Sequence, residues 1–386
     1  AGIDDATWPY FIGGDLPALM PPNQREGGGI VNFGRVRAIA ARKFTSLKRD
    51  HRTFAFIVIM PAIQILLFGI AIGQSPVGLE VAVISSEATD IDDDLMAKLG
   101  SSDALVLHDE YTSVGDARTA ISEGNLWAAI VVTDTGGIEI HLDNSNQQVS
   151  STILVEVRNA LTEILEEKGV TPPLEVADPV YGDKDPAFIN FLAPGIITLV
   201  CFMFSLILTT MSFVGERYDG TLDRVFAAGT KPSEVLIGHM IAFTSILIGQ
   251  VSTVILIAVY GFDIPLNGNP LMVFMLAMLL GWSAMCIGMF ISTKATSEFQ
   301  AIQLNMPFMF LVLLVSGILW PVEALPSWLQ PISWGLPTTW TAEAFRSIMI
   351  RGWGFEQTLV AGAFVYNIVF AGIMLMVAAK SLKTQD

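Results

Sequence analysis

Six long, uncharged and mostly apolar runs interrupt the polar parts of this chain. A helix that crosses the hydrocarbon core of a membrane needs about 20 apolar residues, because each residue adds about 1.5 Å and every backbone polar group must be bonded within the helix. The pattern therefore predicts a polytopic α-helical membrane protein with six transmembrane helices. The runs are Thr53 to Gly73, Pro186 to Gly215, Met240 to Phe262, Ile264 to Thr293, Phe299 to Val322 and Gln357 to Ala379.

A seventh uncharged run, from Ala324 to Ala342, differs from the six because three prolines interrupt it. Proline inside a helix removes a hydrogen bond and clashes with the preceding turn. Five of the eight tryptophans of the chain also fall between residues 320 and 353, and indole rings prefer the headgroup level of a membrane. We therefore expect a re-entrant hairpin over 321–350, before the sixth span. The alternative is an ordinary proline-rich loop.

A basic amphipathic segment, residues 31–52, precedes the first span at 53–73. Its arginines and lysines lie opposite an apolar helical face, which is typical of a helix on a membrane surface. Basic residues are concentrated here and in the short tail 380–386, so the positive-inside rule places both termini in the cytoplasm of a multi-pass cell-membrane protein. The residues predicted to share the apolar face are Phe33, Val36, Ala40, Phe44 and Leu47.

Residues 74–185 form a long polar segment, which this orientation places outside the cell. They hold 22 acidic residues against five basic ones, a net charge of −17, so this segment accounts for the charge of −16 of the whole chain. Strand and helix patterns alternate along it, which predicts an α/β domain. The cluster Asp90 to Asp94 lacks the alternating ligands and central glycine of a calcium loop, so we expect a solvated acidic face and no metal site. The strand patterns are 79–85, 104–108, 127–133 and 138–142, and the helix patterns are 92–99, 113–123 and 147–168.

Composition and missing motifs exclude several classes of protein. The chain is 52% hydrophobic and 15% charged, whereas soluble domains carry about 25% charged residues. A basic nucleic-acid footprint is absent, so we expect no nucleic-acid partner. The chain has no Gly-Lys dipeptide and hence no phosphate-binding loop of the type G-x-x-x-x-G-K-[ST], and it has neither H-E-x-x-H nor G-x-S-x-G. We therefore expect no catalytic site in this chain.

The cytoplasmic segment 216–239 combines charged and apolar side chains at close spacing. A short amphipathic helix of this kind can present several charges to a partner at the membrane surface. A helical loop with its own ion pairs at i,i+3 and i,i+4 explains the spacing equally well. The charged residues are Glu216, Arg217, Asp219, Asp223 and Arg224, next to Leu222, Val225 and Phe226.

Three segments resemble permeases of the ABC type-2 exporter family, which includes the G and H subfamilies and many bacterial drug, lipid and polysaccharide exporters. One is residues 41–73, similar to the family's connecting helix and first span. The likeness runs from about residue 31 onward. Residues 1–30 match no part of the family, and we interpret them as an N-terminal extension, a linker or a tag. The motif residues of the other two segments are Glu216, Gly220, Thr221, Leu222, Asp223 and Arg224, and then Gly317, Pro321, Pro326, Trp328, Pro337, Thr339, Arg346, Arg351 and Gly352.

The resemblance implies a permease that forms a homodimer in membrane lipid and docks two ABC ATPases on its cytoplasmic face. ATP and Mg²⁺ would be bound by those ATPases, with no cofactor in this chain. The coupling element would comprise Glu216, Arg217, Gly220, Thr221, Leu222, Asp223 and Arg224. The hairpin at the exit would comprise Pro321, Pro326, Trp328, Pro337, Glu343 and Arg346. We expect Glu343 and Arg346, three residues apart, to pair, because an unpaired charge near membrane depth is costly.

In this family the substrate cavity lies between the second and fifth spans at the dimer axis, within the helical region 186–379. Aromatic, methionine and small polar side chains there suit an amphipathic substrate. Packing of the second span through Gly195, Ser205 and Thr209 explains the same residues nearly as well. The cavity candidates are Phe191, Thr198, Phe202, Ser205, Gln303, Met306 and Phe310.

The function that we expect is export of a lipid or of a hydrophobic or amphipathic compound from the cytoplasm or inner leaflet, by alternating access. One alternative is export of a lipid-linked polysaccharide. Another is a non-transporting receptor, in which the spans anchor the acidic outer domain. An ATPase in the preceding sequence or in a neighbouring gene would favour transport.

Overall fold

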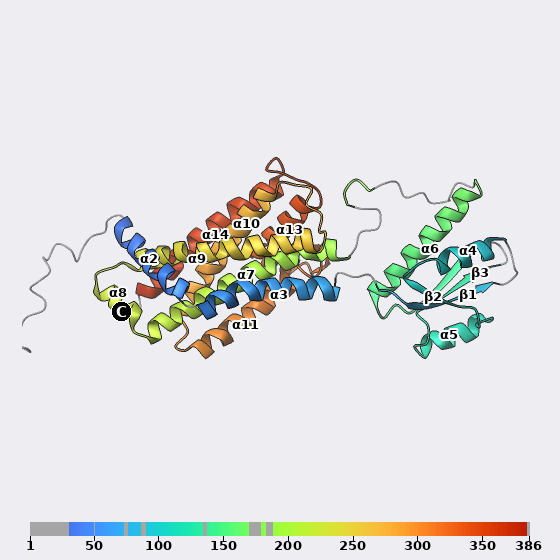
Figure 1. Ribbon diagram of the computed structural model, residues 1–386, viewed down its shortest axis with the longest axis horizontal. Coiled ribbons are helices and arrows are strands. Elements are labelled where there is room, and N and C mark those ends of the chain that lie inside the picture. Colours follow the sequence, from blue (N-terminus) through green and yellow to red (C-terminus); the bar gives the residue numbers. More distant parts are fainter. Residues whose placement is uncertain are drawn as a thin grey trace, which may run out of the picture.

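The computed structural model describes residues 31–49, 51–72, 76–85, 90–133, 137–169, 179–182 and 188–383. Figure 1 shows an all-helical bundle and a smaller α/β unit. The prediction for 1–30 lies outside the described residues. The long helices of the bundle are α3 (His51–Ile72), α7 (Phe188–Tyr218), α9 (Pro232–Leu256), α10 (Pro270–Ser292), α11 (Glu298–Val315) and α14 (Thr358–Lys383).

Each of the six apolar runs overlaps one of these helices, although α9 begins at Pro232, before the run from Met240, and α10 begins at Pro270, after the start of the run from Ile264. Five of the described helices, α7, α9, α10, α11 and α14, are long and apolar enough to cross a membrane, and α3 has a shorter described apolar stretch, Ile59–Ala71. The prediction that the fifth run continues to Val322 is wrong, because α11 ends at Val315. Gly317 then adopts a left-handed conformation with φ of 70°, which a continuing helix cannot contain.

Helix α7 is the centre of the bundle, and most of its side chains are buried. Its hydroxyl groups donate hydrogen bonds to backbone carbonyls one turn earlier in the same helix. Thr198 donates to the carbonyl of Pro194 at 2.9 Å, and Ser205 donates to that of Cys201 at 2.7 Å. Such bonds let polar side chains pack among apolar ones without an unpaired donor. The π-helix η3 (Ile257–Gly261) continues α9.

The region after α11 is broken into short helices, as the prolines predicted. They are η4 (Val322–Ala324), α12 (Gln330–Trp334) and α13 (Pro337–Met349). Pro337 is the first residue of α13, a position where the missing N–H costs nothing. Ser333 donates to the carbonyl of Val315 at 2.6 Å, so α12 folds back onto the end of α11.

Helix α2 (Phe33–Arg49) confirms the predicted amphipathic helix, but its buried face is rotated from the predicted one. Phe33 is 79% exposed and Phe44 is also exposed. Ile39 and Lys43 are buried instead, because α2 packs against α9 on that side. Gly238 of α9 permits this approach, since a Cβ there would lie 2.7 Å from Ile39 Cγ2. The buried side chains of α2 are Val36, Ile39, Ala40, Lys43 and Leu47.

The α/β unit contains a four-stranded sheet in the order β2-β1-β3-β4. Strand β1 pairs in parallel with β2 and β3, and β4 is antiparallel to β3. Helices α4 and α6 cover one face of the sheet through Leu95 and Ile153, and α5 covers the other through Ala117. The elements are β1 (Leu79–Ser85), α4 (Asp90–Gly100), β2 (Leu105–His108), α5 (Val114–Ser122), β3 (Ala128–Val132), β4 (Ile138–Leu142) and α6 (Gln147–Glu167).

Candidate functional site

Helices α2, α7 and α9 meet at the carboxylate of Glu216, near the end of α7. Lys43 Nζ donates to Oε1 at 2.5 Å, and Arg42 Nη2 donates to Oε2 at 3.1 Å. Nε2 of His239, on α9, lies 2.9 Å from Oε1. The side chain of Glu216 is only 12% exposed. We call these four residues the Glu216 hub; it fastens the surface helix α2 to two apolar helices.

The buried imidazole of His239 is held by contacts of both ring nitrogens and of the ring face. Its Nδ1 lies 2.8 Å from the carbonyl of Val235, one turn earlier in α9. The ring of Phe213 lies against it with centroids 4.5 Å apart, and Phe243 lies on α9 one turn further on. Both ring nitrogens therefore face an acceptor, and the aromatic rings exclude other partners.

A second clamp joins the start of α2 to the loop before α9. Glu234 is almost fully buried, and its carboxylate accepts from the backbone N–H of Asn32 at 2.8 Å and of Lys231 at 3.0 Å. Arg35 of α2 donates to the carbonyl of Gly229 at 2.6 Å. The clamp and the Glu216 hub hold α2 to the bundle at both ends of its buried stripe.

The short helix α8 (Thr221–Ala227) follows α7 after Gly220, which has a left-handed φ of 62°. Arg217 anchors this turn by donating to the carbonyls of Ser292 and Ala295 at 3.1 and 3.2 Å. Leu222 points into the bundle and is buried. The predicted coupling residues thus separate into two groups. Glu216, Arg217 and Leu222 face the protein, whereas Asp223 and Arg224 are exposed to solvent.

The outer face of this element is formed by side chains that α8 and the end of α7 leave in solvent. Tyr218, Asp223 and Arg224 are exposed. The side chain of Arg224 makes no hydrogen bond or ion pair with any residue that the structure describes. In Figure 1, α8 lies at the same end of the bundle as α2 and the C-terminus, whereas α13 lies at the other end. The exposed face of α8 is therefore available to a partner at that end.

The predicted pair of Glu343 and Arg346 is confirmed, with Nη1 donating to Oε1 at 2.5 Å. Arg346 also donates through Nη2 to the carbonyl of Gly317 at 2.9 Å, and its guanidinium lies 4.3 Å from the ring centroid of Phe191. The arginine thus binds the turn after α11 to the start of α7. Of the other hairpin candidates, Pro337 is buried, whereas Trp328 is exposed.

The predicted cavity residues lie in two different environments. Thr198, Phe202 and Ser205 are buried within the chain, and the Phe202 ring packs against Phe308 of α11 with centroids 6.0 Å apart. Gln303, Met306 and Phe310 lie on the outward face of α11 and are exposed. Phe191 lies beneath Arg346. Within the described chain these side chains do not enclose a common space, so the cavity stays a prediction.

The chain matches the family model described as "ABC-2 family transporter protein" over residues 51–380. It belongs to the ABC-2 transporter permease family. This permease is 31% identical to ABC transporter G family member 20 of Dictyostelium discoideum, over 94% of its own length and 53% of the relative's. It is 29% identical to member 23 of the same organism, over 84% and 49%. The chain spans about half the length of these two relatives.

A bacterial relative matches along most of its length. The permease is 23% identical to the probable multidrug ABC transporter permease YbhR of Escherichia coli K12, over 83% of this chain and 90% of the relative. The chain is thus a multi-pass membrane protein of the ABC-2 transporter permease family.

Five side chains of the Glu216 hub and the clamp were not predicted as site residues from the sequence: Arg35, Arg42, Lys43, Glu234 and His239. A signal was present for Lys43, because it interrupts the apolar stripe of α2 on the side that proved to be buried. No such signal marked His239, because its partner Glu216 lies on another helix. Among the described residues, no three His, Cys, Asp or Glu side chains gather in a way that could hold a metal ion.

Proposed function

We propose that this chain is the membrane subunit of an ATP-driven exporter, with six spans, both termini in the cytoplasm and the α/β unit outside the cell. Two copies form the translocation path and move a lipid or a hydrophobic or amphipathic compound outward by alternating access. The proposal rests on helix α8. Its outer face is exposed, and its inner side is anchored to the long helices by the buried side chain of Leu222 and by the hydrogen bonds of Arg217. The printed names of the relatives, which include a multidrug ABC transporter permease, support the same class of activity.

The structure suggests how motion would pass from an ATPase to the spans. A companion that docks on Tyr218, Asp223 and Arg224 pushes on a helix whose inner side is held by Leu222 and Arg217. The Glu216 hub lies directly behind, on the same helix, α7. A displacement of α8 therefore moves α7 together with α2 and α9, because charges that are paired and buried resist separation.

The ATPase companion supplies the chemical step of the transport cycle, which is ATP hydrolysis. It would bind ATP and Mg²⁺, for which this chain has no phosphate-binding loop of the type described above. The residues of this chain would convert closure of the ATPases into a change of access. Helix α13 lies at the end of the bundle opposite to α8 (Figure 1), and α12 and α13 would form the re-entrant hairpin at the exit.

The experiment that tests the proposal compares Arg224→Ala with wild type in the intact assembly, purified in mild detergent and reconstituted into vesicles. We expect an ABC ATPase to copurify with the wild-type permease, and we expect Arg224→Ala to lower transport per ATP hydrolysed. Arg37→Ala is the matched control, because Arg37 is also exposed and lies on α2 at the same end of the bundle.

Two results would contradict the proposal. One is an assembly that contains no ATPase when its companions are identified by mass spectrometry; this result would favour the receptor alternative. The other is a transport-to-hydrolysis ratio that is the same in Arg224→Ala and wild type at equal expression; this result would remove Arg224 from the docking face.

A further inference from the structure

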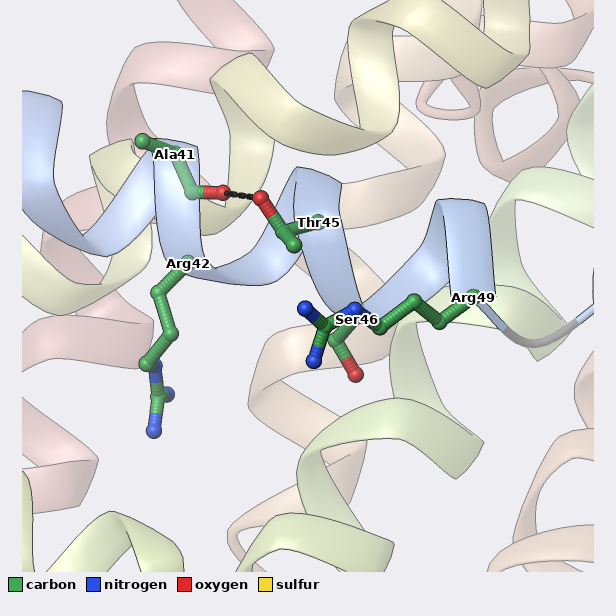
Figure 2. A pocket seen from close by; sticks show the side chains of 5 residues that line it. All are labelled: Ala41, Arg42, Thr45, Ser46 and Arg49. Carbon is green, nitrogen blue, oxygen red and sulfur yellow. Dashed lines mark hydrogen bonds between the residues drawn. The ribbon is translucent and has the colours of Figure 1, made fainter.

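An open pocket of about 660 Å³ lies along one side of α2. Figure 2 shows the guanidinium groups of Arg42 and Arg49 on the side of the helix where the Ser46 hydroxyl also lies. The hydroxyl of Thr45 turns back to the carbonyl of Ala41 at 2.8 Å. The positions 42, 46 and 49 follow the i, i+4, i+7 spacing of one helical face. The pocket therefore presents two cations and a free hydroxyl group in a row.

A second pocket, of about 480 Å³, lies between α2 and α7 and adjoins the first, because Arg42 and Ser46 line both. Its other lining residues are partly polar and partly apolar, and the polar ones are Lys43, Ser212, Glu216, Asp219 and Thr221. The apolar lining comes from Leu47 of α2 and from Phe204, Ile207, Leu208 and Met211 of α7. The two pockets together form a site with a cationic mouth and an apolar groove, which we call the α2–α7 groove.

The charge of this site favours an anionic ligand. Helix α2 carries six basic residues and no acidic one. The second pocket is also lined by two acidic residues, Glu216 and Asp219. The Glu216 carboxylate is already bound by Lys43, Arg42 and His239, and no acidic residue lines the first pocket, where the phosphate would lie. The side chain of Arg49 makes no hydrogen bond or ion pair with the residues that the structure describes. A phosphate at the mouth would therefore find a guanidinium that is not committed elsewhere.

The position of the groove decides which anion fits. Helix α2 directly precedes α3 and has a buried apolar stripe with basic residues beside it, so it lies at the headgroup level of a leaflet. The groove runs from this level along α7 toward the apolar part of the bundle. A soluble phosphate would leave the apolar wall uncovered, whereas an acyl chain would cover it.

We propose that the α2–α7 groove binds an anionic glycerophospholipid of the cytoplasmic leaflet, with its phosphate between Arg42, Ser46 and Arg49 and one acyl chain along Ile207 and Leu208. The lipid is a structural or regulatory ligand and not the cargo, so the proposal does not depend on what the permease exports. The headgroup lies beside Arg42, which also donates to Glu216, so the lipid lies next to the Glu216 hub.

Lipid retention by the full-length chain tests this proposal. The purified protein is titrated in detergent with dioleoyl-phosphatidylglycerol or dioleoyl-phosphatidylcholine, and bound lipids are counted by native mass spectrometry. We expect one phosphatidylglycerol to bind at least about fivefold more tightly than phosphatidylcholine, the factor that one basic contact with an anionic lipid provides. Arg49→Gln should remove this preference.

Two further variants separate a built site from general attraction. Ile207→Trp fills the apolar groove and should weaken phosphatidylglycerol binding although it changes no charge. Arg37→Gln is the matched control for Arg49→Gln: it removes the same charge from the same helix, but Arg37 lies five residues before Arg42, or roughly 140° around the helix. Arg37 lines neither pocket, so this variant should retain the lipid.

Three outcomes would overturn the proposal. Equal losses in Arg37→Gln and Arg49→Gln would show that attraction to α2 is diffuse. Equal binding of the two lipids would show that the anion is not recognised. Displacement of the lipid by millimolar glycerol 3-phosphate, which has the phosphate but no acyl chain, would show an anion site in which the apolar groove has no part.

Discussion

The Nε2 of His239 on α9 lies 2.9 Å from the Oε1 of Glu216 on α7, and Lys43 of α2 reaches the same oxygen. Three helices thus share one carboxylate oxygen. Glu216 belongs to the motif that we predicted to contact a partner, yet its side chain points into the protein. Its principal role in this structure is to hold α2 against the bundle.

Replacement of Glu216 is therefore expected to affect stability first. Glu216→Ala leaves Lys43 and His239 buried without their acceptor, and removing one partner of a buried ion pair costs about 3 kcal/mol or more. The thermal unfolding midpoint of the full chain in detergent should fall. Asp219→Ala is the control, because Asp219 is exposed and lies one turn further along the chain. An unchanged midpoint for Glu216→Ala would contradict the hub.

Arg346 should not be replaceable by lysine. Its planar guanidinium reaches Glu343, the carbonyl of Gly317 and the ring of Phe191 at once, which a single ammonium group cannot do. Arg346→Lys should leave the Gly317 carbonyl without its donor and cost about 2 kcal/mol. Thermal unfolding in detergent measures the loss, and Arg37→Lys, at an exposed position on α2, should unfold like wild type.

Gly317 should tolerate no side chain. Its φ of 70° is left-handed, and an added Cβ would lie 2.8 Å from Cγ2 of Val322. Gly317→Ala is expected to cost about 2 kcal/mol from backbone strain alone. Gly372→Ala in α14 is the matched control, because a Cβ there meets nothing within 4 Å and alanine favours a helix by about 1 kcal/mol over glycine. Equal unfolding midpoints for the two variants would be the contrary result.

The α/β unit should weaken as the pH rises above neutrality. A side-chain hydrogen bond with Glu80 is the main cause that raises the pKa of His108 above its ordinary value, and the charge of Glu110 adds to it. A raised folded-state pKa stabilises the fold at low pH, and this contribution disappears as the pH passes through that pKa. Hydrogen exchange of β1 and β2 should show it between about pH 6 and 8, around the ordinary histidine value.

Glu80→Gln is the control for this pH dependence. It removes the charge that faces His108 while keeping the shape of the side chain. At each pH the exchange rates of wild type and variant are compared, which cancels the intrinsic effect of pH on exchange. Wild type should be the more protected of the two at low pH and lose this advantage at high pH; a constant difference would disprove the linkage.

The two groups of cavity candidates should respond differently to truncation. Phe202 is 1% exposed and packs in the core, so Phe202→Ala should cost about 3 kcal/mol or more in stability. Met306 is 56% exposed, so Met306→Ala should leave the unfolding midpoint unchanged. If α11 lines the path in the dimer, the substrate profile of Met306→Ala in a transport assay should change. A wild-type profile would remove Met306 from the candidates.

Local patterns predicted most of the elements, because helices in lipid and strands in a small sheet depend on nearby residues. The runs at 186–215 and 357–379 became α7 and α14, and the strand at 79–85 was placed to the residue. The end of α11 was missed because the left-handed turn at Gly317 depends on packing against Val322 and Arg346. The order of strands also depends on contacts between distant segments.

The site was predictable only in its outline. The motif around Thr221 indicated a surface element, but the separation of its residues into buried and exposed ones required the neighbouring helices. Lys43 and Glu216 lie 173 positions apart in the chain, so no pattern within either segment could show their contact. The rotation of α2, which buries Lys43 and exposes Phe44, likewise depends on packing against α9, a distant segment of the chain.

Helix α8 has seven residues, whereas an isolated peptide in water needs about 12 to 15 residues before a helix becomes marginally stable. It persists only because Leu222 and the turn at Gly220 tie it to a larger body. Cut out as a synthetic peptide, this stretch would be a coil and would compete poorly for whatever recognises it. Inhibitors based on it would have to be stapled or cyclised to regain the shape that the intact molecule provides in advance.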